Sequence, residues 1–387
     1  MIKIILTGGG SAGHVTPNLA LIPRLKQLDA DAQIHYIGSA DGIERDIIAK
    51  TPGITYHPIR TGKLRRYFSL KNFTDPFRVI GGYHDAKKII KELRPDLVFS
   101  KGGFVSVPVA AAAHHYKIPV VSHESDITPG LANRIAKKYA TKICLTFPDT
   151  LKQIAPPLGV CTGSPIREEL FHGDPEKARK MLGFDQKPVI LVMGGSLGAK
   201  SINQAVRGSL KTLTARYNII HLCGRNNLDS TLQYDVSPAQ KPQPPDAPAQ
   251  KSAQTDRAYL KSYAQFEFIS EELPDFLALA DFVVSRAGSN AIHEFLALHK
   301  PMLLIPLSLE ASRGDQILNA ASFEKRGFAI VLRDEKLSPQ TLVSAIGYLE
   351  KDQSALIEKM KAEPNTNGVG KIIGLIKSLL PTLNTNN

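Results

Sequence analysis

Two glycine-rich segments contain side chains that could handle phosphate. The first is Gly8-Gly9-Gly10-Ser11-Ala12-Gly13-His14, and the second is Gly194-Gly195-Ser196-Leu197-Gly198-Ala199. Each follows an apolar run and precedes a helix-like pattern, so backbone N–H groups at a helix N-terminus could bind an anion there. Ser196 adds a hydroxyl donor. Either segment could instead be a tight turn, but the pair favours a donor site on one domain and an acceptor site on the other.

The first segment fits the G-x-G-x-x-G pattern, yet two familiar nucleotide sites do not fit it. The next apolar run ends in Tyr36-Ile37-Gly38-Ser39, without the acidic residue that holds a ribose in a plain NAD site. After Gly13 comes His14-Val15 rather than the Lys-Ser or Lys-Thr of a P-loop. His14 is therefore a general base or a phosphate contact, or it caps or packs a helix.

Arg286-Ala287-Gly288-Ser289-Asn290 forms a small-residue turn after another apolar run. Glu294, further along the helix that should follow, could accept two hydrogen bonds from a ribose diol. It could equally be a solvated glutamate that complements the helix dipole.

Gln316 and Asn319 lie three residues apart near a helix start, which suits sugar hydroxyls or ordinary helix capping. Asp29-Ala30-Asp31 resembles a D-x-D metal motif, but acidic residues are common in the turn where it lies. We expect no metal site.

The segment from Gly62 to Phe73 combines four cations with bulky apolar residues. Such a mixture suits an anionic bilayer interface, where apolar groups enter the headgroup boundary and cations attract the lipid charge. The alternative is packing beneath a neighbouring helix with the cations extended into solvent. The residues expected at the membrane are Leu64, Arg65, Arg66, Tyr67, Phe68 and Phe73.

Short apolar runs alternate with helix-periodic segments along the whole chain, which predicts an α/β protein with parallel sheets. The rhythm restarts after Pro165, so we expect two Rossmann-like domains joined near Gly163-Ser164-Pro165, spanning 1–163 and 164–387. The predicted strands are Lys3–Thr7, Gln33–Ile37, Leu97–Ser100, Val120–His123, Lys142–Thr146, Val189–Met193, Ile219–Cys223, Phe266–Ile269, Phe282–Ser285 and Met302–Ile305.

Length and composition agree with this division. A chain of 387 residues exceeds what one hydrophobic core usually supports. Residues 237–253, rich in Pro and Gln, should be a disordered insertion, and Lys371–Leu380 a short amphipathic helix. No run approaches the roughly 18 apolar residues of a membrane-spanning helix, and the three cysteines suit a reducing compartment. The net charge of +12 favours phosphorylated ligands or an anionic membrane, because no nucleic-acid recognition motif is present.

The chain resembles the MurG family of peptidoglycan synthesis, because several of its motifs occur in the family's order along the sequence. Besides the segments above, the resemblance includes Ser100-Lys101-Gly102-Gly103-Phe104, His123-Glu124-Ser125-Asp126 and Pro129-Gly130-Leu131-Ala132-Asn133. It covers nearly the whole chain apart from the Pro/Gln insertion. The chain departs from the family at Asp126, where Asn is common, and at Ser11-Ala12-Gly13, where many members have Thr-Gly-Gly.

The resemblance implies a GT-B fold, with two Rossmann-like domains facing across a cleft and a C-terminal helix, within 371–387, that returns to the first domain. It implies inverting transfer of N-acetylglucosamine (GlcNAc) from UDP-GlcNAc to the 4-hydroxyl of N-acetylmuramic acid (MurNAc) in lipid I, giving lipid II, without a cofactor. His14 would be the general base, and the first domain would face the acceptor and the membrane. The implied UDP-GlcNAc contacts are Ser11, Ala12, Gly13, Asp126, Arg167, Ser196, Ile269, Gly288, Ser289, Asn290, Glu294 and Gln316.

The same resemblance implies a peripheral protein on the cytoplasmic side of the cell membrane, serving cell-wall biogenesis, cell shape and division. Its partners would be UDP-GlcNAc, undecaprenyl-pyrophosphoryl-MurNAc-pentapeptide, anionic lipid and other proteins of cell-wall synthesis. Three rival functions remain open at this point: a transferase acting on another lipid such as diacylglycerol, a sugar-nucleotide epimerase, and a non-catalytic nucleotide-sugar-binding module.

Overall fold

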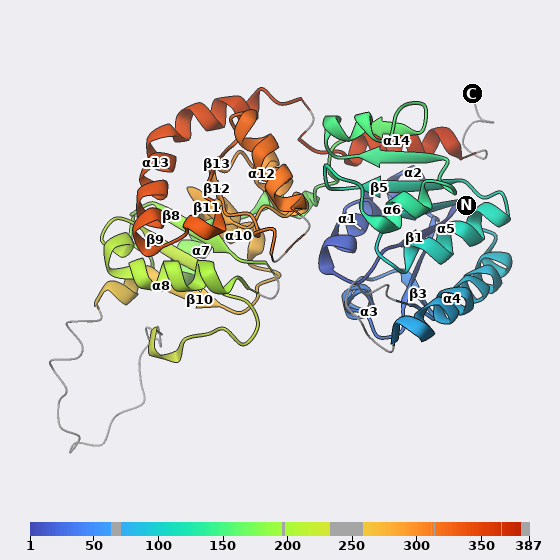
Figure 1. Ribbon diagram of the computed structural model, residues 1–387, viewed down its shortest axis with the longest axis horizontal. Coiled ribbons are helices and arrows are strands. Elements are labelled where there is room, and N and C mark those ends of the chain that lie inside the picture. Colours follow the sequence, from blue (N-terminus) through green and yellow to red (C-terminus); the bar gives the residue numbers. More distant parts are fainter. Residues whose placement is uncertain are drawn as a thin grey trace, which may run out of the picture. The chain divides into compact units, whose positions relative to one another are not determined.

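The chain forms two compact units, drawn in Figure 1. Unit 1 comprises Met1–Arg167 and Asn365–Asn387, and unit 2 comprises Glu168–Pro364. The computed structural model describes residues 1–62, 71–195, 198–232, 258–310, 312, 314–364 and 366–380, without the side chains of 71–76. The chain therefore passes from unit 1 to unit 2 after Arg167 and returns near Asn365.

Unit 1 is built on a seven-stranded parallel sheet with the order β3-β2-β1-β4-β5-β6-β7. Its strands are β1 (Lys3–Thr7), β2 (Gln33–Ser39), β3 (Ile54–Ile59), β4 (Leu97–Ser100), β5 (Val120–Glu124), β6 (Lys142–Leu145) and β7 (Gly159–Cys161). Its helices are η1 (Ala12–His14), α1 (Thr16–Leu19), α2 (Ile22–Leu28), α3 (Ile43–Ala49), α4 (Lys71–Leu93), α5 (Ser106–His115), α6 (Leu131–Ala136), η2 (Pro148–Lys152) and α14 (Val369–Leu379).

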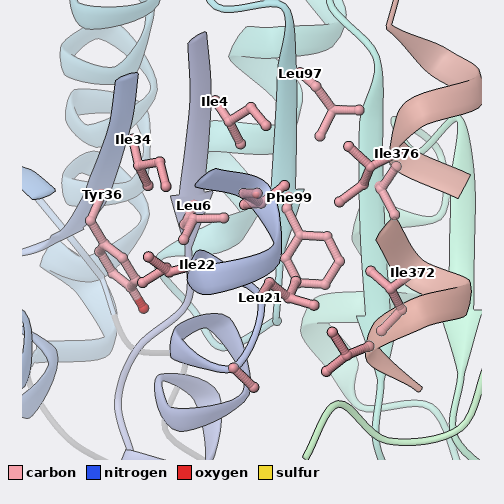
Figure 2. Packing of buried hydrophobic residues seen from close by; sticks show 14 of the residues in the cluster. Ile4, Leu6, Leu21, Ile22, Ile34, Tyr36, Leu97, Phe99, Ile372 and Ile376 are labelled. Atoms are coloured by element: carbon pink, nitrogen blue, oxygen red, sulfur yellow. The ribbon is translucent and has the colours of Figure 1, made fainter. Parts of the chain in front are cut away.

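Helices cover both faces of this sheet, which explains why its central strands are continuous apolar runs. One face packs under α4 and α5, with Ala86, Ile90 and Val109 in its buried core. The other face packs under α2 and α14. Figure 2 shows Ile372 and Ile376 of α14 beside Phe99 and Leu97 of β4, and both isoleucines are fully buried. Their i, i+4 spacing is the predicted apolar stripe of the C-terminal helix.

Unit 2 repeats the design with a six-stranded parallel sheet of order β10-β9-β8-β11-β12-β13. Its strands are β8 (Val189–Met193), β9 (Asn218–Leu222), β10 (Tyr263–Phe266), β11 (Phe282–Ser285), β12 (Met302–Leu304) and β13 (Ala329–Val331). Its helices are η3 (Glu168–His172), α7 (Pro175–Leu182), α8 (Lys200–Thr214), η4 (Ser230–Leu232), η5 (Ala258–Ser262), α10 (Leu273–Leu279), α11 (Ser289–Ala297), α12 (Asp315–Lys325), η6 (Asp334–Lys336) and α13 (Pro339–Lys361).

Both sheets have one point where the strand order reverses direction. In unit 1 it lies between β1 and β4, and in unit 2 between β8 and β11. Ligands of open α/β sheets bind outside the carboxyl ends of the strands at such a point. The first glycine-rich segment follows β1 and the second follows β8, so both stand where the topology favours a ligand.

The predicted α/β class with parallel sheets is confirmed, and most predicted strands agree within two residues. The exception is β10, which we expected at Phe266–Ile269 and which runs instead over Tyr263–Phe266. The polar Gln265 interrupts the short apolar run, so the sequence pattern did not indicate this edge strand. Its side-chain amide donates to the Asp229 carbonyl at 2.6 Å, and its side-chain oxygen accepts from Arg207 at 3.2 Å, so its burial is compensated.

Some predictions fall outside the described residues. These are the 237–253 insertion, Ser196, and the membrane residues Leu64, Arg65, Arg66, Tyr67 and Phe68, while Phe73 lies in α4 among the undescribed side chains. In the described part of the chain, no helix has the length and apolar character needed to cross a bilayer.

Candidate functional site

The glycine-rich turn after β1 is anchored by a buried carboxylate that the sequence did not reveal. Glu44 of α3 is fully buried, and it accepts hydrogen bonds from Gly10 N at 3.2 Å and from Ser39 N at 3.0 Å. Gly10 has φ +86°, which favours glycine. The Gly10 amide therefore serves the fold, and any anion bound here would use other donors of the turn.

His14 ends the single turn η1 and is half-buried rather than a core residue. Its Nδ1 lies 3.0 Å from Ser11 Oγ. Burial, followed by the charge of Lys101, lowers the pKa of His14 to about 4, although a hydrogen bond to the Gly9 carbonyl and the Glu44 charge act in the opposite direction. At neutral pH the imidazole is unprotonated, which is the form that can accept a proton.

The segment after β4 meets the glycine turn. A Cβ on Gly103 would come within 2.3 Å of the Gly9 carbonyl oxygen, so the two backbones are in close contact. Lys101, which directly follows β4, is only 2% exposed, and its Nζ lies 2.9 Å from His123 Nδ1. A lysine is rarely so buried without a specific role in the surrounding structure.

Asp126 lies at the carboxyl end of β5 in a loop held by a second buried carboxylate. Glu124 accepts from Asp126 N at 3.0 Å, from Gly130 N at 2.9 Å and from Asn133 Nδ2 at 2.8 Å. Burial raises the pKa of Glu124. Asp126 is itself half-exposed, so its side chain stands in a fixed loop within reach of solvent.

The described residues of the second glycine-rich segment, Gly194, Gly195, Gly198 and Ala199, lie between β8 and α8. Gly195 and Gly198 have φ values of +91° and +77°, and Gly198 N donates to the Gly195 carbonyl at 2.9 Å. The N-cap residue of α8, Ala199, provides no side-chain cap for the first helical amides. These N–H groups suit an anion at the start of a 15-residue helix.

The turn after β11 is fixed by Arg286, which is 8% exposed. Its guanidinium donates to the Ile305 carbonyl at 3.0 Å and to Ser201 Oγ of α8 at 2.8 Å, and it pairs with Asp334 at 2.9 Å. It thereby connects the starts of α8 and α11, η6 and the end of β12. Gly288 caps α11 without a side-chain hydrogen bond, and a Cβ there would meet nothing within 4 Å.

Three more predicted contacts of unit 2 lie on segments that follow strands of its sheet. Glu294 lies in α11, and Ile269 follows β10 in a buried position. Gln316 lies in the first turn of α12, where its side-chain oxygen accepts from Leu307 N at 3.1 Å. Asn319, which we paired with Gln316, is fully buried and donates to the Ala287 carbonyl at 3.2 Å. It thereby supports the Arg286 turn.

The remaining predicted residues lie in unit 1. Ser11 is exposed, Ala12 and Gly13 are half-buried in η1, and Arg167 is the last residue of the unit. Asp29 of the D-x-D match accepts from Ile2 N at 2.6 Å and from Asp31 N at 3.0 Å, so its carboxylate closes a turn. Within the described ranges, no group of three or more His, Cys, Asp or Glu could hold a metal ion.

Sequence reasoning missed the buried charges that position these segments. Glu44 gave no indication, because it lies in an ordinary helical pattern 34 residues from the turn that it anchors. Lys101 did offer one: a lysine directly between an apolar strand and two glycines is unusual, since its side chain must enter the region where strands end.

The comparisons with known proteins agree with this architecture. Residues 4–145 match the N-terminal domain of glycosyltransferase family 28, and residues 189–376 match its C-terminal domain. The chain is 53% identical over 378 residues to the UDP-N-acetylglucosamine–N-acetylmuramyl-(pentapeptide) pyrophosphoryl-undecaprenol N-acetylglucosamine transferase of Clostridium botulinum strain Hall, covering 97% of this chain and 99% of that protein. The protein of the same name from Clostridium tetani is 51% identical, with 97% of each chain covered.

Solved structures share the fold. MurG of Acinetobacter baumannii has a TM-score of 0.70 at 23% identity, covering 98% of this chain and 100% of that one. The UDP-GlcNAc 2-epimerase of Neisseria meningitidis has a TM-score of 0.61 at 13% identity, covering 98% and 99%. At these identities the likeness shows the GT-B fold alone.

Proposed function

The chain belongs to the MurG family within glycosyltransferase family 28, and we propose that it transfers GlcNAc from UDP-GlcNAc to the MurNAc 4-hydroxyl of lipid I, giving lipid II. It is thus a hexosyltransferase of peptidoglycan precursor synthesis. The observation that carries this function is the 53% identity to a transferase of that name over 97% of the chain. The positions of the predicted residues at the carboxyl ends of both sheets support it.

Unit 2 would bind the donor. The uncapped starts of α8 and α11 offer N–H groups to the diphosphate and the sugar, with Ser196 and Arg167 as additional donors. Glu294 would accept from the ribose hydroxyls. In this arrangement, the Ile269 backbone would recognise uracil.

The remaining donor contacts would involve the sugar. On unit 2 these are Gln316 and the Gly288–Asn290 turn, which includes Ser289. Ser11, Ala12, Gly13 and Asp126 of unit 1 would provide the others. Because Gln316 already accepts from Leu307 N, its NH₂ group is the part suited to a sugar oxygen.

His14 would act as the general base. The 4-hydroxyl of MurNAc attacks the anomeric carbon of GlcNAc, its proton passes to the imidazole, and the bond to UDP breaks with inversion at that carbon. Negative charge grows on the departing diphosphate, so the α8 amides and Arg167 would stabilise the transition state more than the ground state. The acceptor's own pyrophosphate is anionic and would raise the pKa of His14 towards working pH on binding.

Membrane association on the cytoplasmic face would begin at the predicted segment and continue into α4. There Phe77 is 76% exposed and Ile80 is 55% exposed, which is unusual for large apolar side chains. Val79, Ile80, Tyr83, Val107 and Ala111 are among the residues that line an adjoining apolar cavity of about 410 Å³. Exposed cations of the same helix, Lys88 and Lys91, suit anionic headgroups.

Labelled UDP-GlcNAc offered with a lipid I analogue or with diacylglycerol tests the proposal directly. We expect label only in the lipid I product. Label in diacylglycerol would indicate the rival lipid transferase, and conversion of UDP-GlcNAc without any acceptor would indicate an epimerase. Donor binding without turnover under either condition would reduce the protein to a binding module.

A further inference from the structure

Lys101 directly follows β4, at the carboxyl edge of the sheet of unit 1 where the first glycine-rich segment also lies. Its backbone N donates to the Thr7 carbonyl at 2.8 Å, which joins the end of β4 to the end of β1. A Cβ on Gly8 would lie 3.2 Å from Lys101 Cβ and 2.3 Å from the His14 carbonyl oxygen. Lys101 and the His14 turn are therefore both packed against the side of Gly8 that a Cβ would occupy.

The ammonium group is directed towards the end of β5. It lies 2.9 Å from His123 Nδ1 and also bonds Ser125 Oγ. His123 Nε2 is 3.2 Å from the Gly163 carbonyl oxygen, which can only accept. The proton of the ring therefore belongs on Nε2, and Nδ1 is left to accept from the lysine.

The loop that begins at Ser125 thus has two buried ionisable anchors. Glu124 holds its backbone at Asp126 N and Gly130 N, as described above. Lys101 holds the side chain of Ser125, the first residue of the loop. Hydrogen bonds to charged groups are stronger than neutral ones, so together they fix the segment that presents Asp126.

The same ammonium contributes, after burial, to the electrostatics of the neighbouring turn. Burial lowers the pKa of Lys101 to about 8, and the Glu124, Asp126 and Cys144 groups act in the opposite direction. Lys101 is therefore mainly charged at pH 7. Its charge favours the neutral form of His14, against the Glu44 carboxylate and the Gly9 carbonyl, which favour the protonated form.

We propose that Lys101 is a positioning residue for the transfer: through Ser125 its ammonium holds the loop that bears Asp126, and its charge, packed beside the His14 turn, adds to the burial that favours the neutral His14 ring. This inference deepens the proposed function and rests on it. The two effects are separable, because a change at Ser125 removes the hydroxyl anchor and leaves the charge in place.

The test compares three variants of the full-length protein with wild type. Lys101→Met removes both the anchor and the charge, Ser125→Ala removes the anchor alone, and Lys50→Met removes an exposed charge from the same unit. Ring titration by NMR, without substrate and with His14 assigned from a His14→Gln spectrum, measures the effect of the Lys101 charge on His14. UDP release with a lipid I analogue gives kcat and the KM for UDP-GlcNAc.

We expect the His14 pKa to rise in Lys101→Met and to stay at the wild-type value in Ser125→Ala and Lys50→Met. We expect KM to rise about tenfold in Lys101→Met and Ser125→Ala, the effect of one lost charged hydrogen bond.

An unchanged His14 titration in folded Lys101→Met would overturn the electrostatic role, and an unchanged KM in Ser125→Ala would overturn the anchoring role. If wild type releases no UDP, the proposed function fails, while the titration still decides the electrostatic role. If Lys101→Met does not fold, Lys101→Gln takes its place.

Discussion

Three buried charges, Glu44, Lys101 and Arg286, lie next to the segments proposed to bind ligands. A charge taken out of water is costly unless hydrogen bonds compensate it, and each of these groups has such partners. They hold loops in place, while the groups proposed to contact ligands, such as His14 and Asp126, remain half-exposed. At the scale of single residues, the side chains that hold the loops are therefore different from those proposed to contact ligands.

The low pKa of His14 predicts two different acidic limbs. The profile of kcat/KM reports the free protein and that of kcat reports the complex. Protonation of His14 removes the base as pH falls, so the limb of kcat/KM should lie near the free pKa of about 4. The limb of kcat should lie at higher pH, because the bound pyrophosphate favours the imidazolium. A kcat/KM limb at or above pH 6.5 would contradict this account.

Replacing His14 by Ala should lower kcat by about 10²–10⁴-fold, the usual contribution of a general base. Binding of UDP-GlcNAc, measured by calorimetry, should change little by comparison. Near-normal turnover in the variant, with donor binding intact, would remove His14 from the role of base.

Arg286→Lys tests whether the fork of this guanidinium organises unit 2. The guanidinium reaches the Ile305 carbonyl and Asp334 through one nitrogen and Ser201 through the other, and a lysine, whose three donors share one nitrogen, cannot reproduce this fork. We expect a lower Tm and a higher KM for UDP-GlcNAc. Arg216→Lys changes an exposed arginine of the same unit, which pairs with Glu350 and lies over the Tyr217 ring, and serves as the control. Equal behaviour of the two variants would argue against the organising role.

At the scale of elements, the ends of parallel strands determine where chemistry can occur. In unit 1, Gly8–Gly10 follow β1 and Lys101 follows β4, so they share the carboxyl edge of that sheet. In unit 2, Gly194–Gly195 follow β8 and Arg286 follows β11, so they share the carboxyl edge of the second sheet. Helix α14 contributes differently. It follows unit 2 in the sequence and completes the core of unit 1.

Ile372→Ala therefore tests a contact between distant parts of the chain. The side chain is fully buried beside Phe99, so truncation should destabilise unit 1 by about 2–5 kcal/mol. Hydrogen exchange should show faster opening in β1 and β4 and little change in β8 and β11. Lys377→Ala, an exposed change in the same helix, should have no such effect. Equal loss of protection in both units would contradict the assignment of α14.

At the scale of the whole molecule, apolar runs and glycine turns were enough to predict two parallel sheets. Their residues are local in sequence, so periodicity reveals them. The sequence could not show that Glu44 anchors Gly10 or that Arg286 joins four segments, because those contacts depend on which strands become neighbours. Asn319 illustrates the same limit. Its position near a helix start suited either a sugar contact or helix capping, and the fold places its side chain in the core against the Ala287 carbonyl.

The proposed membrane association also belongs to the scale of the whole protein. Phe77→Ser with Ile80→Ser should weaken binding to vesicles that contain anionic lipid, because two large exposed apolar groups are lost. Tyr348→Ser, which removes an exposed aromatic from unit 2, is the matched control and should bind as wild type does. Sedimentation with the vesicles measures both. Undiminished binding of the double variant would exclude the α4 surface.

The most direct test of the central claim is UDP release with and without a lipid I analogue. We predict little release from UDP-GlcNAc alone and release proportional to protein concentration once the acceptor is added. UDP release at the same rate in the presence and absence of the acceptor would contradict the account.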